Sequence, residues 1–278
     1  MKKNILFLTY QGSPDLNKED QTLVKHLEEQ ANVIPLIWQE PLPKTPIDLA
    51  VIRTTWDYYK EPENFLKKLK EIEDRGIPLH NSTPVLEWNF NKKYLLQMAE
   101  ENLPIVPTTQ AKTQNLTLIY EKQIVKPLIS AASFGTFIVT KEHLEETKHE
   151  LEKLKIEDVL IQPFRESVHT EGEFAFMYFG TSYSHAVIKK PKPKDFRVQE
   201  EHGGSTAYIT PSKKDLEQSH AIAQWLEKKF PGTLYARVDM IRAPEGHLEL
   251  MELELIEPFL FMSHHPASFE LFASKILV

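Results

Sequence analysis

The chain has 278 residues, enough to bury about three quarters of the surface of its unfolded form in one large domain or several smaller ones. Charged residues make up 26% and hydrophobic residues 41%, which excludes global disorder, and a formal net charge of −7 argues against a general binder of nucleic acid or anionic membranes. The absence of cysteine excludes disulfides, thiolate zinc sites and cysteine nucleophiles.

The first residues predict a strand and not a targeting signal. Met1-Lys2-Lys3 precedes only a short apolar stretch, Ile5–Tyr10, with no cleavage signal after it. No segment of the sequence is long enough to span a membrane. We therefore expect a cytoplasmic protein that binds neither nucleic acid nor membrane.

Strands and helices alternate over the first part of the chain, up to about residue 81. This alternation predicts a small doubly wound α/β domain, in which ligands bind beyond the carboxyl ends of the strands. Gly76 stands at the position that ends a helix. The predicted strands and helices are Asn4–Tyr10, Lys18–Gln30, Val33–Trp38, Leu49–Thr55, a helix that turns Phe65, Leu66, Leu69 and Ile72 inward, and Ile77–Asn81.

Arg53 and Asp57 follow the apolar strand residues Leu49–Ile52, with Trp56, Tyr58 and Tyr59 beside them. The planar guanidinium of Arg53 is suited to recognising a substrate carboxylate. An ordinary surface salt bridge explains an arginine here equally well. We expect substrate contacts from Arg53 and Asp57.

The second half contains groups that can bind phosphate. Lys92 falls in the first turns of a helix predicted over Trp88–Asn102, and Lys126 ends the strand Ile124–Pro127. The small-residue loop Ser130–Thr136 then offers backbone N–H groups in the concave arrangement that binds anions. Each lysine alone is more typical of a surface, but their order along the chain favours a phosphate site.

Further predicted elements separate these groups from the end of the chain. The segment Pro191–Gly204 has no periodicity, and loops of this length are usually functional or disordered. It carries Lys192, Lys194, Asp195, Arg197, Gln199 and Gly203-Gly204. The other predicted elements are Phe137–Thr140, a helix over Glu142–Lys155, Asp158–Phe164, Phe174–Phe179, Tyr183–Lys189, a helix capped by Ser212 that stops at Pro231-Gly232, and a last helix after Pro258.

Near the C-terminus, an acidic strand pair is predicted. Leu248–Pro258 alternates apolar and acidic residues, and Tyr235–Ile241 precedes it across the turn signal Ala243–Gly246. A two-residue loop, Glu245-Gly246, places Pro244 opposite His247. In this register, Asp239 lies opposite Glu252 and Arg237 lies opposite Glu254.

The two faces of this hairpin differ in chemistry. One face is wholly apolar and predicts packing on a core: Ala236, Val238, Met240, Met251, Leu253 and Leu255. The other brings together Asp239, Glu252 and Glu254, hard oxygen donors that suit Mg²⁺ held with substrate phosphates. A solvated acidic face of an ordinary amphipathic strand is the alternative.

Common nucleotide and hydrolase motifs are absent from the sequence. It contains neither G-x-x-x-x-G-K-[ST] nor G-x-G-x-x-G, and neither H-E-x-x-H nor G-x-S-x-G. The adjacent pair His264-His265 is poorly placed for shared ligation, because side chains at i and i+1 diverge. The phosphate site is therefore built in another way.

The ordered set of short motifs resembles the ATP-grasp superfamily of carboxylate–amine ligases, in its glutathione-synthetase-like branch. It looks closest to the ligase type that closes the cycloserine ring. The resemblance covers about two thirds of the chain, and the matching segments are Asn81-Ser82 with Trp88-Asn89, Lys92-Lys93-Tyr94-Leu95, Val125-Lys126-Pro127, Gln162-Pro163-Phe164, Glu171-Gly172-Glu173, Ser184–Lys189, Asp195–Gln199 with Gly203-Gly204, Ala236–Asp239 and Met251–Pro258.

The resemblance implies an N-terminal doubly wound α/β domain followed by a two-subdomain ATP-grasp fold, with ATP clamped between the subdomains. The implied ranges are 1–86 for the substrate domain, 87–164 for the small subdomain and 165–278 for the C-terminal subdomain with the metal site. Two departures from the family pattern stand out. Many relatives have asparagine in place of Glu254, and the phosphate loop has one glycine, Gly135, where relatives often have more.

The resemblance also assigns roles to residues, in four groups. Arg197 and Lys189 are the expected catalytic residues, and Asp239, Glu252 and Glu254 the expected metal ligands. The expected substrate contacts, besides Arg53 and Asp57, are Arg237, Gly203 and Gly204. The expected ATP contacts are Lys92, Lys126, Ser133, Gly135, Gln162, Phe164, Glu166, Glu171 and Glu173.

We therefore predict a ligase that depends on ATP and on Mg²⁺ or Mn²⁺. A substrate carboxylate, or a carboxyl-like carbonyl oxygen, attacks the γ-phosphate, and a nitrogen nucleophile then displaces phosphate from the acylphosphate to form a C–N bond. The substrate is amino-acid-like, and the sequence leaves ring closure and a homodimer open. An ATP-grasp kinase and a non-catalytic ATP-binding regulatory or scaffold protein are the alternatives.

Overall fold

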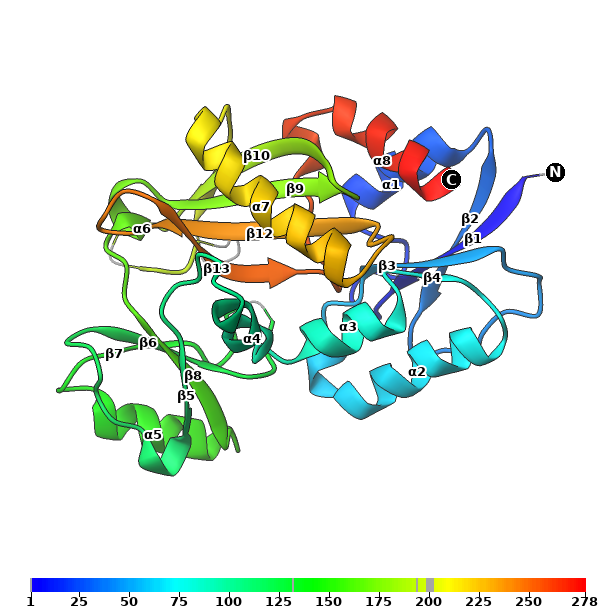
Figure 1. The fold of residues 1–278 in the computed structure, drawn as a ribbon. Helices are drawn as coiled ribbons and strands as arrows, with labels where there is room; N and C mark the ends of the chain where they lie inside the picture. Colours follow the sequence, from blue (N-terminus) through cyan, green and yellow to red (C-terminus); the bar gives the residue numbers. More distant parts are fainter. Residues whose placement is uncertain (1, 132, 194, 199–202) are drawn as a thin grey trace.

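The structure is a computed structural model that describes residues 2–131, 133–193, 195–198 and 203–278. Three sheets lie within these ranges, and Figure 1 shows the N-terminal sheet at the right, the larger antiparallel sheet in the upper part and the smaller one at the lower left. The predicted fold class, a doubly wound α/β part followed by α+β parts, is confirmed by this arrangement. Lys194 and Gln199 of the predicted loop lie outside the described residues, as does Ala132 of the small-residue loop.

The N-terminal sheet is parallel and has helices on both faces. Ile5 and Phe7 pack toward α1, whereas Leu6 and Leu8 pack toward α2, as the period-2 alternation of a strand requires. Its strand order, β2-β1-β3-β4, brings the first strand to the middle. The elements are β1 (Lys3–Thr9), α1 (Lys18–Leu27), β2 (Ala31–Ile37), β3 (Leu49–Thr54), η1 (Tyr58–Lys60), α2 (Pro62–Asp74) and β4 (Leu79–His80).

The smaller antiparallel sheet has the order β5-β8-β6-β7 and one helix on its apolar face. Leu151 of that helix packs on Val125, Val139 and Val159 of the strands. The elements are β5 (Thr109–Lys112), η2 (Thr113–Asn115), β6 (Gln123–Pro127), β7 (Phe137–Val139), α5 (Leu144–Lys153) and β8 (Asp158–Pro163).

The larger antiparallel sheet has the order β11-β10-β9-β12-β13. Helix α7 runs across one of its faces (Figure 1), and Ser212 caps that helix by accepting a hydrogen bond from the backbone of Asp215 at 3.1 Å. The elements are α6 (Ser167–Thr170), β9 (Glu173–Phe179), β10 (Ser182–Lys190), β11 (Ser205–Ile209), α7 (Lys213–Lys229), β12 (Tyr235–Arg242), β13 (Leu248–Glu254), η4 (Met262–His264) and α8 (Ala267–Leu277).

The end of the chain returns to its beginning. Helix α8 lies beside α1 (Figure 1), and Phe272 packs in one core with Ile5 and Phe7 of the N-terminal sheet and with Phe179 of the larger sheet. Each of the three predicted ranges thus contains one sheet. However, α8, the last helix of the third range, packs against the N-terminal sheet of the first range. The boundaries at 86 and 164 stay predictions.

Two asparagine side chains join the N-terminal part to the β12–β13 hairpin. Asn81 donates to the carbonyls of Tyr235 and Leu255 at 3.0 and 2.8 Å, and its own oxygen accepts from the backbone of Leu234. Asn89 donates to the carbonyl of Leu253 at 2.8 Å and accepts from the backbone of Leu255. These amides fix the carboxyl end of β13 against the segment that precedes Lys92.

The helix predicted over Trp88–Asn102 is wrong as one element. The structure has two helices, α3 (Thr83–Phe90) and α4 (Tyr94–Glu100), because Asn91 between them is extended, with φ −111° and ψ 119°. The side chain of Asn91 accepts a hydrogen bond from the backbone of Lys93, and the backbone of Lys92 donates to the carbonyl of Leu128. Tertiary hydrogen bonds at the break therefore replace those of a continuous helix.

The register of the acidic hairpin is as predicted at its acidic end, where Asp239 pairs with Glu252 and Arg237 with Glu254. The predicted turn is wrong. The loop has three residues, because Ala243 donates to the carbonyl of His247, and Met251 forms a bulge between the pairs Asp239–Glu252 and Met240–Leu250. The two one-residue differences cancel, which is why the acids still face each other.

The bulge also corrects the predicted apolar face. Leu250, and not Met251, packs on the core with Val238 and Leu253, while Met251 turns to the acidic side of the hairpin. A bulge shifts the alternation by one residue, so that Leu250 takes the core position that Met251 was expected to fill.

Leu253→Ala should destabilise the protein by about 2–5 kcal/mol, the usual cost of removing a buried leucine side chain. Leu253 is only 1% exposed. Met251→Ala, two residues away on the other side of the sheet, should cost clearly less. Urea unfolding of both variants measures the difference, and equal losses would contradict the bulged register.

No helix in the described ranges is both long enough and apolar enough to cross a membrane.

Candidate active site

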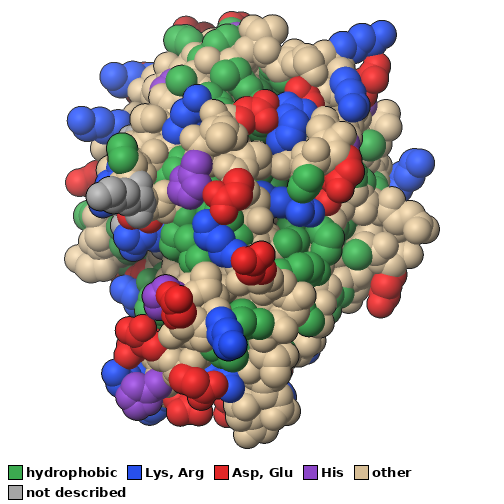
Figure 2. All heavy atoms as spheres, turned by 90° about the vertical axis from the view of Figure 1, so that its left-hand side faces the viewer, with side chains coloured by type: hydrophobic (Ala, Val, Ile, Leu, Met, Phe, Trp, Pro, Cys, Tyr) green, Lys and Arg blue, Asp and Glu red, His purple; other side chains and the backbone are tan. Residues whose placement is uncertain are grey.

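The larger and smaller sheets enclose a cavity of about 480 Å³, to which the N-terminal part also contributes. Figure 2 shows a face of the molecule on which acidic and basic side chains are interspersed with hydrophobic ones. The cavity is lined from the smaller sheet by Lys126 and Gln162, from the larger sheet by Asp239 and Glu252, and from the N-terminal part by Trp56.

One end of the cavity is apolar. Its chemistry suits a flat ring, because branched and aromatic side chains from two strands of the larger sheet and from the connecting segments meet there in one cluster. Gln162 at its edge is buried and donates to Thr108 at 2.9 Å. The cluster that lines this end consists of Val106, Phe164, Val168, Val198, Ile241 and Met251.

Two buried lysines stand at the middle of the cavity. The Nζ atom of Lys92 lies 2.9 Å from Oε1 of Glu252 and donates to the carbonyl of Ser130 at 2.6 Å. The Nζ atom of Lys126 donates to the carbonyl of Met251 at 3.2 Å. Among the described residues, Lys126 has no ion-pair partner, so its charge is available to an anionic ligand.

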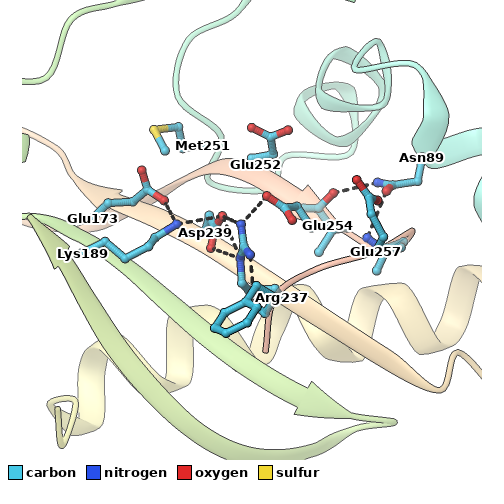
Figure 3. A network of polar contacts seen from close by, with 12 residues as sticks. Asn89, Glu173, Lys189, Arg237, Asp239, Met251, Glu252, Glu254 and Glu257 are labelled. Carbon is cyan, nitrogen blue, oxygen red and sulfur yellow. Dashed lines mark hydrogen bonds and ion pairs between the residues drawn. The ribbon is translucent and has the colours of Figure 1, made fainter. Parts of the chain in front are cut away.

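Acids and bases alternate along the floor of the cavity, as Figure 3 shows. Lys189 forms ion pairs with Glu173 and, at 3.2 Å, with Asp239. Arg237 contacts the same Asp239 at 2.9 Å and also pairs with Glu254. The five side chains form one continuous network, in which each carboxylate has a cation beside it.

The network shifts the pKa values of its members in different directions. Burial opposes ionisation of Glu252, but Lys92 and Lys126 lower its pKa to about 2. Burial raises the pKa of Glu254 to about 7 against the effect of Arg237. Burial lowers the pKa of Lys126 although Glu252 acts in the opposite direction. A site that binds a highly charged ligand is consistent with such shifts.

Arg197 reaches the cavity from the long loop. Its guanidinium donates two hydrogen bonds to Asp195, from Nε to Oδ1 at 3.1 Å and from Nη2 to Oδ2 at 2.9 Å. The side chain of Arg197 is 38% exposed, and this contact lowers the pKa of Asp195. The loop thus presents the planar guanidinium of Arg197, whose orientation is fixed by its two hydrogen bonds to Asp195.

The acids Asp239, Glu252 and Glu254 suit a hard cation by their chemistry, and all three line the cavity. Among the described residues, however, no group of three histidine, aspartate or glutamate side chains is close enough to hold a metal ion by itself. Mg²⁺ is commonly held by one or two carboxylates together with phosphates and water. The donor set therefore fits a metal that arrives with a phosphate ligand.

Sequence comparison places this cavity in a known family. The profile of the prokaryotic glutathione synthetase ATP-grasp domain matches residues 92–259, more than half of the chain. The chain belongs to the ATP-grasp family. The predicted family is confirmed, and so is the predicted enzyme class, an ATP-dependent ligase of the ATP-grasp type. A second profile, the N-terminal domain of D-cycloserine synthetase DcsG, matches residues 5–81.

Relatives of this ATP-grasp chain are similar over most of its length. The cycloserine biosynthesis protein DcsG of Streptomyces lavendulae is 23% identical over 236 residues, 77% of each chain. The crystal structure of D-cycloserine synthetase DcsG has a TM-score of 0.85 at 19% identity and covers 99% of this chain and 98% of that one. D-alanine–D-alanine ligase from Bacillus anthracis has a TM-score of 0.70 at 14% identity, with coverage of 99% and 96%.

Most of the residues that the resemblance assigned to ATP-grasp chemistry line this cavity. They lie on facing strands and loops, so that chain folding brings them together from positions up to 162 residues apart. These residues are Lys92, Lys126, Ser133, Gln162, Phe164, Glu173, Lys189, Arg197, Arg237, Asp239, Glu252 and Glu254.

Other predicted site residues lie away from the cavity. Arg53 is 2% exposed, pairs with Asp20 at 2.8 Å and is packed between the rings of Tyr235 and Phe272. It serves the fold, because a buried guanidinium needs a carboxylate partner. Asp57 accepts hydrogen bonds from the side chains of Trp38 and Gln39, so we withdraw both residues as substrate contacts.

Two of the glutamates expected at ATP also lie elsewhere. Glu171 accepts two hydrogen bonds from Arg242 outside the cavity, whereas Glu173, two residues further on, lines the cavity. Glu166 is 67% exposed and pairs with Lys122 at 2.7 Å. The backbone N–H of Phe164 already donates to the carbonyl of Lys122 at 3.0 Å, so it is not free for an adenine ring.

The glycines expected at the ligand have different surroundings. A side chain on Gly135, where φ is +67°, would meet Pro127 at 2.8 Å and Ile156 at 2.9 Å, so the loop requires glycine for packing. Gly135 lines a shallower hollow beside the cavity. Gly203 and Gly204 precede β11 and line neither the cavity nor the shallower hollow. The structure therefore does not bring them to the proposed substrate.

Several other residues line the cavity, of which Trp56 and Tyr58 belong to the aromatic run expected at the ligand-binding edge, whereas Glu257 and Phe259 were given no role from the sequence. Glu257 follows the end of β13, and Trp56, Tyr58 and Phe259 stand near it at the far end from the apolar cluster. Burial and the nearby Glu254 raise the pKa of Glu257 to about 8. A signal for Glu257 was present in the sequence, since this acid breaks the alternation just before Pro258.

Proposed function

We propose that this protein is a ligase that uses ATP with Mg²⁺ or Mn²⁺ to phosphorylate a carboxyl-type oxygen of a small amino-acid-like substrate. A nitrogen nucleophile then attacks the carbon that bears this oxygen, so that a C–N bond forms and inorganic phosphate leaves. The observation that carries the proposal is the convergence of Lys92, Lys126 and Glu252 in one cavity with an apolar pocket at one end. The adenine ring of ATP needs an apolar pocket, and its phosphates need cations and a metal-binding acid next to that pocket.

The cations of the cavity would position and neutralise the phosphates. Lys126, which lacks an ion pair among the described residues, would contact a phosphate oxygen directly. Lys92 would do so while it keeps its contact with Glu252. Phosphoryl transfer depends mainly on positioning and charge neutralisation, which explains why lysine and arginine are the candidates here.

Asp239, Glu252 and Glu254 are the residues that would hold the metal. The metal, when bound, supplies positive charge to the phosphate oxygens. The remaining network has a separate task, because Lys189 and Arg237 hold Asp239 in place from two sides. Arg197 would approach the transferred phosphoryl group from the loop, with Asp195 fixing its orientation.

The nitrogen nucleophile is proposed to belong to the same molecule as the activated oxygen. The likeness to D-cycloserine synthetase extends over both halves of the chain and supports ring closure over the joining of two amino acids. A cytoplasmic location and a homodimer stay predictions.

The protein should bind ATP only weakly without Mg²⁺ or Mn²⁺. Asp239, Glu252 and Glu254 line the cavity together, and carboxylates repel phosphates at short range when no metal lies between them. Calorimetry with ATP, once with excess Mg²⁺ and once with excess chelator, measures the effect. Equal affinities under the two conditions would count decisively against the metal-dependent site.

A further inference from the structure

The end of the cavity that lies away from the apolar cluster combines one acid with aromatic rings from two parts of the chain. Glu257 and Phe259 follow β13, and Trp56 follows β3 of the N-terminal sheet. The indole of Trp56 donates to the carbonyl of Glu257 at 3.1 Å and its ring lies 6.3 Å from that of Phe259. A contact between distant segments thus joins the two sides of this end.

Charge pairing sets Glu257 apart from the other acids of the cavity. Glu173, Asp239, Glu252 and Glu254 each form an ion pair with a lysine or arginine. Glu257 lines the cavity and forms no ion pair with any residue that the structure describes. Without a cation beside it, burial favours the neutral form of the Glu257 carboxyl group, and a cationic ligand placed next to it would favour the carboxylate.

Two groups in the described lining, Lys126 and Glu257, thus lack a partner of opposite charge. Lys126 suits an anionic phosphate, as proposed above, and Glu257 suits a cation. Aromatic faces near Glu257 favour a cation further, because a ring attracts positive charge by its quadrupole.

We propose that Glu257, with Trp56 and Phe259, binds the ammonium group of the substrate, which makes the substrate class a free amino acid or a close derivative with an unmodified amino group. This inference rests on the proposed function, since the activated oxygen is taken to lie at the phosphate end. The acid selects the substrate and takes no part in the chemical step.

The test compares amines with their hydroxy counterparts. Calorimetry in the presence of Mg²⁺ and a non-hydrolysable ATP analogue would measure binding of alanine and serine, in both hands, and of lactate and glycerate, in both hands. We expect wild-type protein to bind at least one of the amino acids at least about tenfold more tightly than its hydroxy counterpart. Glu257→Gln should lose that preference, and Trp56→Leu should reduce it.

The control variant is Glu245→Gln, which removes an exposed acid at the turn of the same hairpin and should keep the preference. The melting temperature and the affinity for the ATP analogue show whether Glu257→Gln is folded. A Glu257→Gln protein that keeps the full preference would overturn the inference. So would wild-type protein that binds amine and hydroxy acid equally, or that binds none of the amines. The proposed function would survive each of these results, because ATP binding and ADP release test it separately.

Discussion

Glu252→Gln is expected to reduce turnover by about 10²–10³-fold, the size of effect seen when one group that stabilises transition-state charge is removed. Glu252 faces Lys92 at 2.9 Å in the cavity, and its side chain is 26% exposed to that space. Glutamine keeps the shape of the side chain and removes its negative charge. The loss therefore concerns the metal and the phosphates and not the packing of the strand.

The fold should survive this substitution. Lys92 retains its hydrogen bond to the carbonyl of Ser130, and the core side of the strand is carried by Leu250 and Leu253. Steady-state ADP release and a thermal melt together measure the two effects, with Glu245→Gln at the turn of the same hairpin as the control. If Glu252→Gln unfolds the protein but leaves specific activity intact, the metal assignment is wrong.

Arg197→Ala is expected to lower kcat by about a hundredfold or more, with a change in ATP affinity below about tenfold, or ~1.4 kcal/mol. The guanidinium of Arg197 lines the cavity from a loop, where it can follow charge that develops on the transferred group. Its effect is thus greater in the transition state than in the complex with ATP.

The conservative variants sharpen this prediction. Arg197→Lys should rescue only part of kcat, because an ammonium group cannot form the bidentate contact of a guanidinium. Asp195→Asn keeps the arginine but weakens the two hydrogen bonds that orient it, so an intermediate loss is expected. Unchanged turnover in Arg197→Ala, with a substrate that supports ADP release, would refute the role.

Local patterns in the sequence were sufficient to predict most elements of the fold. The alternation of apolar and acidic residues in Leu248–Pro258 indicated a strand with two different faces. The pairs at Asp239 and Arg237 were predicted correctly only because the error in the turn and the bulge at Met251 cancel. The bulge at Met251 was not predictable in this way, because it depends on packing between two strands and not on the composition of either. The break at Asn91 has the same origin, since tertiary hydrogen bonds of Lys92 decide it.

The site was predicted less evenly than the fold. Residues whose charge needs a phosphate or a metal, such as Lys126 and Glu252, were found because short motifs carry them. Arg53 was misplaced, since nothing in its strand shows that Asp20, from another element, neutralises it. Trp56 and Glu257 meet only in three dimensions, 201 residues apart, and no spacing in the sequence indicates that contact.

The most direct test of the account follows the γ-phosphate of ATP. Purified protein with Mg²⁺ is given a panel of amino acids and small amines, and ADP, inorganic phosphate and phosphorylated product are counted for each substrate that supports turnover. A ligase of this type gives equal amounts of ADP and inorganic phosphate together with a product that contains a new C–N bond. ADP accompanied by a stable phosphorylated product and no inorganic phosphate would contradict the account in favour of a kinase. No nucleotide turnover with any substrate of the panel would contradict it in favour of a non-catalytic ATP-binding protein.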